Sequence, residues 1–126
     1  MNVSFNNRDP VYVQVVQHFK EKIAVGEFKP GKEIPSRREL ANKLKINPNT
    51  AQRAYKVMEE QQLIYTEGNL PSRITEDKRI LRLMREELIQ ESVNEFIDSC
   101  HSINLPLEEV IELIEVNYLK KDEERE

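Results

Sequence analysis

Two signals for the start of a helix follow each other closely in the first half of this 126-residue chain, and they constrain its fold more than any other feature. Ser36 and Glu39 have the spacing of a capping box. Asn47 and Pro48 form a second start, with a capping side chain before a proline at the first helical position. Because Pro48 also disfavours helical geometry at Asn47, the first helix must end by about Lys45. We therefore predict two short helices joined by a tight turn.

A further helix and a hairpin are expected on either side of this pair. Asp9 and Pro10 repeat the cap-and-proline start, and the apolar stripe that follows them ends at Gly26. Residues 63–66 and 73–75 are rich in strand-forming side chains, and the connection between them contains Gly, Asn and Pro. Residues 1–75 are thus predicted to form a winged helix-turn-helix domain, with the hairpin as the wing.

Residues 76–126 are expected to form two helices. Thr75 would cap a long helix whose apolar seam runs to residue 103, and Pro106 separates it from a helix over 107–119, before a charged end that should fray. Neither helix can bury its apolar stripe alone, which predicts a dimerisation tail. The whole chain is then mainly α with a small β-hairpin. The residues expected in the dimer contact are Leu81, Met84, Leu88, Val93, Phe96, Ile103, Val110 and Ile114.

Charge divides along the same boundary. The first 75 residues contain 12 Lys and Arg against 8 Asp and Glu, whereas the remainder contains 7 against 15. Because charges further apart than about 10 Å are largely screened, a locally basic face suffices to attract a polyanion despite the acidic total. No run of eighteen apolar residues and no signal-peptide layout is present, so a cytoplasmic protein without a membrane partner is expected.

The helix beginning at Pro48 carries side chains suited to reading DNA. A major groove about 12 Å wide admits one helix, and Asn, Gln and Arg can address the base edges on its floor. Side chains in the first two turns are the ones that reach bases, whereas other basic groups serve the phosphates. The predicted base contacts are Asn49, Thr50, Gln52 and Arg53, and the predicted phosphate contacts are Arg37, Arg38 and Lys56.

These segments resemble the GntR family of bacterial transcription regulators, and specifically its short YtrA-like branch. The similarity lies in residues 10–14, 29–41 and 46–55. It implies that Arg38 contacts DNA, that the helix start at Asn47 and the polar residues after it lie at the operator, and that two C-terminal helices build a homodimer. The family's wing commonly has a Gly-x-Gly pattern with a basic tip. Residues 67–73 depart from it, so minor-groove insertion is not expected and Arg73 is predicted only as a phosphate contact.

The leading hypothesis is a homodimeric repressor bound to a palindromic double-stranded operator. An activator, an architectural factor and a module that binds only proteins remain as alternatives. Any small-molecule effector would have at most a crevice at the dimer interface. No catalytic arrangement, cofactor or metal site is expected from the two histidines and one cysteine. Cys100 is either a thiol sensor or, more simply, a buried packing residue.

Overall fold

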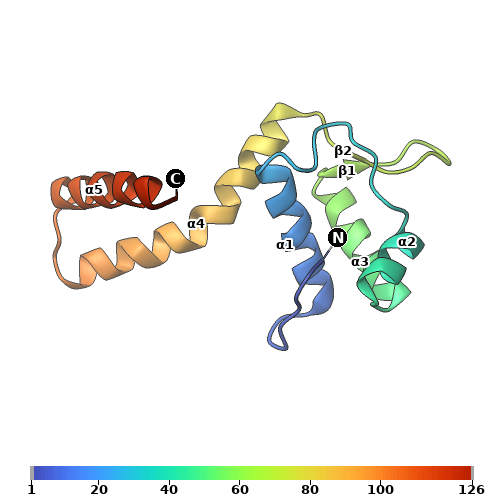
Figure 1. Ribbon diagram of the computed structural model, residues 1–126, viewed down its shortest axis with the longest axis horizontal. Coiled ribbons are helices and arrows are strands. Elements are labelled where there is room, and N and C mark those ends of the chain that lie inside the picture. Colours follow the sequence, from blue (N-terminus) through green and yellow to red (C-terminus); the bar gives the residue numbers. More distant parts are fainter. Residues whose placement is uncertain (1, 126) are drawn as a thin grey trace. The chain divides into compact units, whose positions relative to one another are not determined.

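The computed structural model describes residues 2–125 and confirms a mainly helical chain with one small hairpin (Figure 1). It falls into two units, one up to Leu88 and one from Ile89 onward. None of the described helices is both long and apolar enough to cross a membrane. The elements are α1 (Val11–Ala24), α2 (Arg37–Leu44), α3 (Pro48–Glu60), β1 (Ile64–Tyr65), β2 (Arg73–Ile74), α4 (Lys78–Ser102) and α5 (Leu107–Arg125).

The core of the first unit lies where α1 and α2 pack against α3. Phe19 of α1 meets Tyr55 of α3 edge to face, with ring centroids 6.1 Å apart, and Leu40 brings α2 into the same cluster. All three side chains are fully buried. Aromatic pairs in this geometry add about 0.5–1.5 kcal/mol beyond their buried area, so the Phe19–Tyr55 contact fixes α3 against the rest of the unit.

The two predicted helix starts are confirmed. The Ser36 hydroxyl accepts a hydrogen bond from the Glu39 amide at 3.1 Å, and the Ser36 amide donates to the Glu39 carboxylate at 3.4 Å. At α3, the Asn47 side chain accepts from the Asn49 amide at 2.7 Å, and Pro48 is the first helical residue. Lys45 ends α2 in the left-handed conformation, with φ of 55°. The turn between α2 and α3 is therefore as tight as expected.

Two other predicted caps were wrong. Pro10 occupies the N-cap position of α1 without a side-chain cap, so the helix begins at Val11 and Asp9 does not cap it. At α4, the Asp77 carboxylate accepts from the amides of residues 79 and 80 at 2.9 and 3.3 Å. The Thr75 hydroxyl accepts from the Asp77 amide instead, at 3.1 Å. Aspartate and threonine are both good caps, and the start of the first turn at Lys78 decides which of them is used.

The final helix is longer than predicted. α5 continues to Arg125, whereas we expected the charged end from Lys120 to fray. A run of Lys, Asp, Glu and Arg has good helix propensity, and the apolar stripe that defined the prediction simply ends before the helix does.

The hairpin is short, and a third segment supports it. β1 and β2 pair antiparallel, with Ile64 opposite Ile74 and Tyr65 opposite Arg73. Glu33 forms a single bridge to Arg73, and the backbone of Ile34 donates to Ser72 at 2.9 Å. The linker between α1 and α2 thus lies along β2 and contributes a single bridge to the sheet.

The first turns of α4 belong to the core of the first unit. Met84 is 2% exposed and is part of the core cluster, and Ile80, Leu81 and Leu88 pack against it. The expectation that Met84 forms part of a dimer seam is corrected, because Met84 lies in the core of its own winged-helix unit. Leu81 and Leu88, expected in the same seam, pack against this core and are half-buried. The predicted boundary after residue 75 lies before α4, whereas the division between the units falls inside this helix.

The second unit, described here from residue 89 to 125, buries little on its own. Cys100 and Val110 are its buried side chains, at 6% and 9% exposure. Cys100 is thus a packing residue. The large apolar side chains that remain exposed are Ile89, Val93, Phe96, Ile97, Ile103, Leu107, Ile111, Leu113, Ile114, Val116, Tyr118 and Leu119.

Candidate nucleic-acid interface

α3 has one buried face and one exposed polar face. Ala51, Ala54, Tyr55 and Met58 are all fully buried, which orients the helix. The opposite face is formed by side chains predicted to contact DNA, and those of Asn49, Gln52, Arg53 and Lys56 are exposed whereas Thr50 is half-buried. Because side chains three and four residues apart share a helix face, this set forms one continuous surface.

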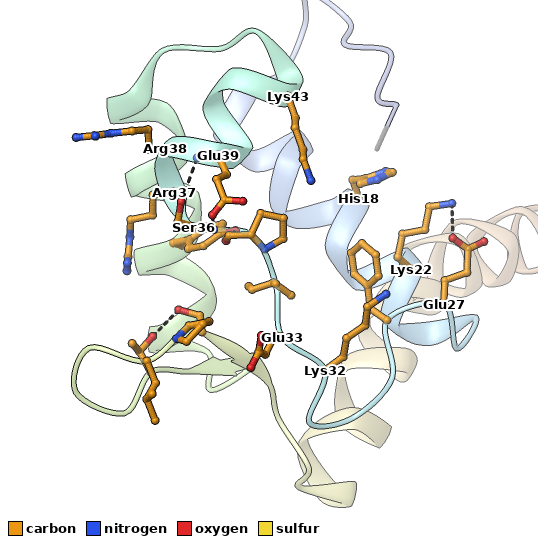
Figure 2. A pocket seen from close by; sticks show the side chains of 18 of the residues that line it. His18, Lys22, Glu27, Lys32, Glu33, Ser36, Arg37, Arg38, Glu39 and Lys43 are labelled. Atoms are coloured by element: carbon orange, nitrogen blue, oxygen red, sulfur yellow. Dashed lines mark hydrogen bonds and ion pairs between the residues drawn. The ribbon is translucent and has the colours of Figure 1, made fainter.

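The two arginines at the start of α2 have different surroundings. Arg38 is exposed. Arg37 is half-buried, forms an ion pair with Glu59 of α3 and lies 5.2 Å from the centroid of the Tyr55 ring. Figure 2 shows both side chains pointing to one side of the adjacent hollow, away from His18. Arg37 therefore holds α2 against α3, and sequence reasoning missed its partner because Glu59 lies twenty-two residues away.

The Tyr55 hydroxyl holds the end of the linker that precedes α2. It donates a hydrogen bond to the carbonyl of Pro35, the residue before the Ser36 cap. Burial raises the pKa of Tyr55 well above its ordinary value, although the nearby Arg37 opposes the shift. The hydroxyl therefore stays protonated and remains a donor.

Arg53 of α3 contacts an aromatic ring of α1. Its guanidinium carbon lies 3.9 Å from the centroid of the Tyr12 ring. Tyr12 is half-buried, and the sequence assigned it only to the apolar stripe of the first helix. The candidate interface thus includes one α1 side chain that no spacing within α3 could reveal.

Arg73 joins the wing to the linker that precedes α2. It donates to the carbonyl of Gly31 at 2.9 Å and to the Glu33 carboxylate at 2.7 Å. The predicted phosphate contact is therefore engaged within the protein. Gly31 has φ of 78°, a left-handed conformation that favours glycine at this turn.

A hollow of about 1230 Å³ lies beside this surface, lined by parts of α1, the linker, α2 and the wing. The carboxylates on its wall have partners. Glu27 pairs with Lys22 at 3.0 Å, Glu33 pairs with Arg73, and Glu39 serves the capping box. No metal-binding cluster of His, Cys, Asp and Glu occurs among residues 2–125.

Comparisons with known proteins agree with this geometry. The model for bacterial regulatory proteins of the gntR family matches residues 11–74. The HTH-type transcriptional repressor YtrA of Bacillus subtilis is 36% identical over 106 residues, which are 83% of this chain and 82% of that protein. The uncharacterized HTH-type transcriptional regulator YhcF of the same organism is 30% identical over 112 residues, covering 89% and 93%.

A solved structure shares both the fold and the sequence pattern. A GntR family transcriptional regulator from Listeria monocytogenes aligns with a TM-score of 0.76 and 32% identity, covering 88% of this chain and 97% of that one. Its agreement over nearly the whole length includes the helices that follow the wing. The chain belongs to the GntR family and is a DNA-binding transcription regulator with a winged helix-turn-helix domain, not an enzyme.

Proposed function

We propose that this regulator is a homodimeric repressor that binds a palindromic operator in the cytoplasm. Each recognition helix, α3, would enter one major groove, with the two half-sites one helical turn, about 34 Å, apart. The observation that carries the proposal is the combination of an exposed reading face on α3 with a second unit that leaves most of its apolar side chains uncovered.

The reading face supplies the DNA contacts. Asn49, Gln52 and Arg53 are exposed near the start of α3, where a helix in the major groove meets base edges. Arg38 and Lys56 are exposed cations that flank this set and suit phosphates. Thr50 and the Asn47 cap complete the surface at the helix start, where amides favour an anion. Arg37 and Arg73 are proposed here as positioning residues: Arg37 positions α2, and Arg73 positions the wing.

A second copy of this chain is the occupant that the second unit requires. Two buried side chains are far too few to stabilise a pair of helices of this length, since burial of a large apolar side chain contributes about 1.5–3 kcal/mol. On α5, Leu113 and Val116 lie on the opposite side from Ile114 and Tyr118, so one neighbouring helix cannot cover both sides.

The side chains available for the dimer contact differ in part from the predicted set. Val93, Phe96, Ile103 and Ile114 are exposed and fit the role. Val110 is buried within its own chain, although the partner can still pack around it. Any small-molecule effector would have at most a crevice at this dimer interface.

Repression is the mode of regulation suggested by the name of one relative. The curated relative named YtrA is called a repressor, and it matches this chain over most of both lengths. A dimer that occupies a promoter excludes polymerase without any further contact. Deletion of the gene should therefore raise transcript levels from the adjoining promoter, whereas lowered levels would identify an activator.

Selection of bound DNA from a random duplex pool tests the proposal most directly. The expected product is an inverted repeat whose half-sites are separated by about one turn, bound with an affinity that falls steeply with salt. Enrichment of a single unrepeated half-site would contradict the symmetric dimer. Absence of any enriched sequence would contradict operator recognition.

A further inference from the structure

We propose that Tyr12 of α1 is a positioning residue for Arg53: its ring supports the guanidinium so that the N–H edge is presented to a base of the operator. Nothing in the sequence of the recognition helix indicates such a role. The inference rests on the proposed function, because it takes Arg53 as a residue that reads DNA.

The geometry of the pair is that of a supported arginine. A separation of 3.9 Å between the guanidinium carbon and the ring centroid is van der Waals contact over the ring face. A guanidinium held by its face keeps its N–H donors free, because those donors lie in the plane of the group. Within residues 2–125, the Arg53 side chain forms no hydrogen bond or ion pair with another residue, so its N–H donors are available to a ligand.

The part of α1 that carries Tyr12 is held in place by two sets of contacts. α1 packs against α3 through the Phe19–Tyr55 contact, which keeps the two helices in one arrangement. The first turn of α1 is tied to the preceding segment by Gln14. Its side chain accepts from the Asn6 amide at 2.9 Å and donates to the carbonyls of Asn6 and Asp9 at 3.1 and 2.8 Å.

These bonds prevent the start of α1 from fraying, although no side chain caps that helix. Tyr12 is the second residue of α1 and lies between Asp9 and Gln14, which this clamp joins. The backbone that carries the half-buried ring is therefore held in place. The Gln14 hydrogen bonds hold the start of α1, and Tyr12 of α1 contacts Arg53. These contacts join the N-terminal segment to the reading face of α3.

A platform of this kind changes selectivity more than it changes general affinity for DNA. A free arginine loses side-chain conformational entropy when it forms two hydrogen bonds to a guanine, and a supported one has already lost part of it. Contacts to phosphates do not depend on the plane of this one guanidinium. Removal of the ring should therefore weaken binding to the operator while leaving binding to random duplexes nearly unchanged.

The test compares Tyr12→Leu with Tyr12→Phe in the full-length protein. The measured quantity is the ratio of affinities for the selected operator and for a random-sequence duplex at one salt concentration. Tyr12→Phe should keep the wild-type ratio, because it retains the ring and no hydrogen bond of the Tyr12 hydroxyl is found within residues 2–125. Tyr12→Leu should lower the ratio roughly two- to fivefold, the factor that corresponds to an exposed cation–π contact.

A double-mutant cycle with Arg53→Ala separates this role from a structural one. If Tyr12 acts through Arg53, Tyr12→Leu should cause no further loss of selectivity in the Arg53→Ala background. Tyr12→Gln, which suits a half-exposed position, provides a second non-aromatic variant with the same expected loss. Thermal melting curves show whether each variant remains folded.

Three results would overturn the inference. A wild-type ratio in folded Tyr12→Leu and Tyr12→Gln would show that the ring does not position Arg53. An equal loss on operator and random DNA would make Tyr12 a structural residue only. If Arg53→Ala itself keeps the wild-type ratio, the reading role given to Arg53 under the proposed function fails first, and the inference fails with it. If Arg53→Ala lowers the affinity ratio but the Tyr12 variants do not, this inference fails while the proposed function stands.

Discussion

Neighbouring residues of the same type have different roles in this protein. The sequence assigned Arg37 and Arg38 alike to phosphates, but the structure pairs Arg37 with Glu59 and leaves Arg38 exposed. Helix geometry explains the difference, since adjacent residues of a helix point about 100° apart and only one of the two can face α3. The pair provides a matched comparison between an arginine that holds α2 against α3 and one that we propose binds DNA.

Arg38→Ala should weaken operator binding and leave stability unchanged. Loss of one phosphate contact should reduce the slope of log K against the logarithm of the salt concentration by about one. Arg37→Ala should instead lower the free energy of unfolding by up to about 1 kcal/mol, the range for a partly exposed ion pair, with a smaller effect on the salt slope. Fluorescence anisotropy over a range of KCl concentrations, together with thermal melting, measures both quantities. Equal changes in slope for the two variants would contradict this assignment.

His18 should make stability depend on pH. Burial lowers its pKa below the ordinary value of 6.5, and the nearby Lys22 lowers it further. The unfolded chain then binds more protons than the folded one, so the contribution of His18 is complete above about pH 6.5 and is lost as the pH falls through the folded value. His18→Gln should flatten the melting temperature between pH 7.5 and pH 5 relative to wild type. Parallel profiles would show that another group titrates.

At the scale of elements, α4 serves two purposes along its length. Its first turns place Met84 in the core of the winged-helix unit, whereas the turns after Leu88 carry exposed apolar side chains. The apolar positions continue through both parts with helical spacing. Periodicity alone therefore showed that one side of this helix is apolar and needs a partner. It did not show that the partner of the first turns is the winged-helix unit.

Met84→Ala should destabilise the winged-helix unit rather than dissociate a dimer. Truncation of a buried methionine costs about 2–5 kcal/mol through lost transfer energy and the remaining cavity. Arg82→Ala, at a nearby exposed position of the same helix, is the control and should change stability by less than about 0.5 kcal/mol. Chemical denaturation measures the difference, and sedimentation should show the same mass for all three folded proteins. A stable Met84→Ala monomer would instead restore Met84 to the dimer contact.

At the scale of the whole molecule, the two units have unequal internal support. The first contains fifteen buried residues in one cluster, whereas the described part of the second buries Cys100 and Val110. Contiguous exposed apolar surface is common at protein–protein interfaces, which supports the proposed dimer. Stability and DNA binding are thus expected to depend on protein concentration.

Phe96→Asp should produce a monomer of 14.9 kDa with sharply weaker operator binding, because a charge would be buried at the proposed contact. Asn94→Asp introduces the same charge at an exposed polar position two residues earlier and should remain dimeric. Sedimentation equilibrium gives the mass, and anisotropy gives the affinity. An unchanged dimer mass for Phe96→Asp would exclude this face from the interface.

The sequence by itself determined the features whose interactions are local. The Ser36 capping box and the Asn47–Pro48 start involve atoms within three residues of each other, so their spacing was sufficient to predict α2, α3 and the turn between them. The exposed and buried faces of α3 followed from helical periodicity for the same reason. The likeness to the GntR family in those segments was confirmed by the family match over residues 11–74.

Only the tertiary structure decided which distant groups meet. Arg37 with Glu59, Arg73 with Glu33, Arg53 with Tyr12, and Met84 with the core all join residues from separate elements. A repeat of apolar or charged residues shows that a side chain needs a partner, but the packing of helices chooses the partner. For that reason the reading face was visible in the sequence, whereas the contacts that hold its arginines in position were not.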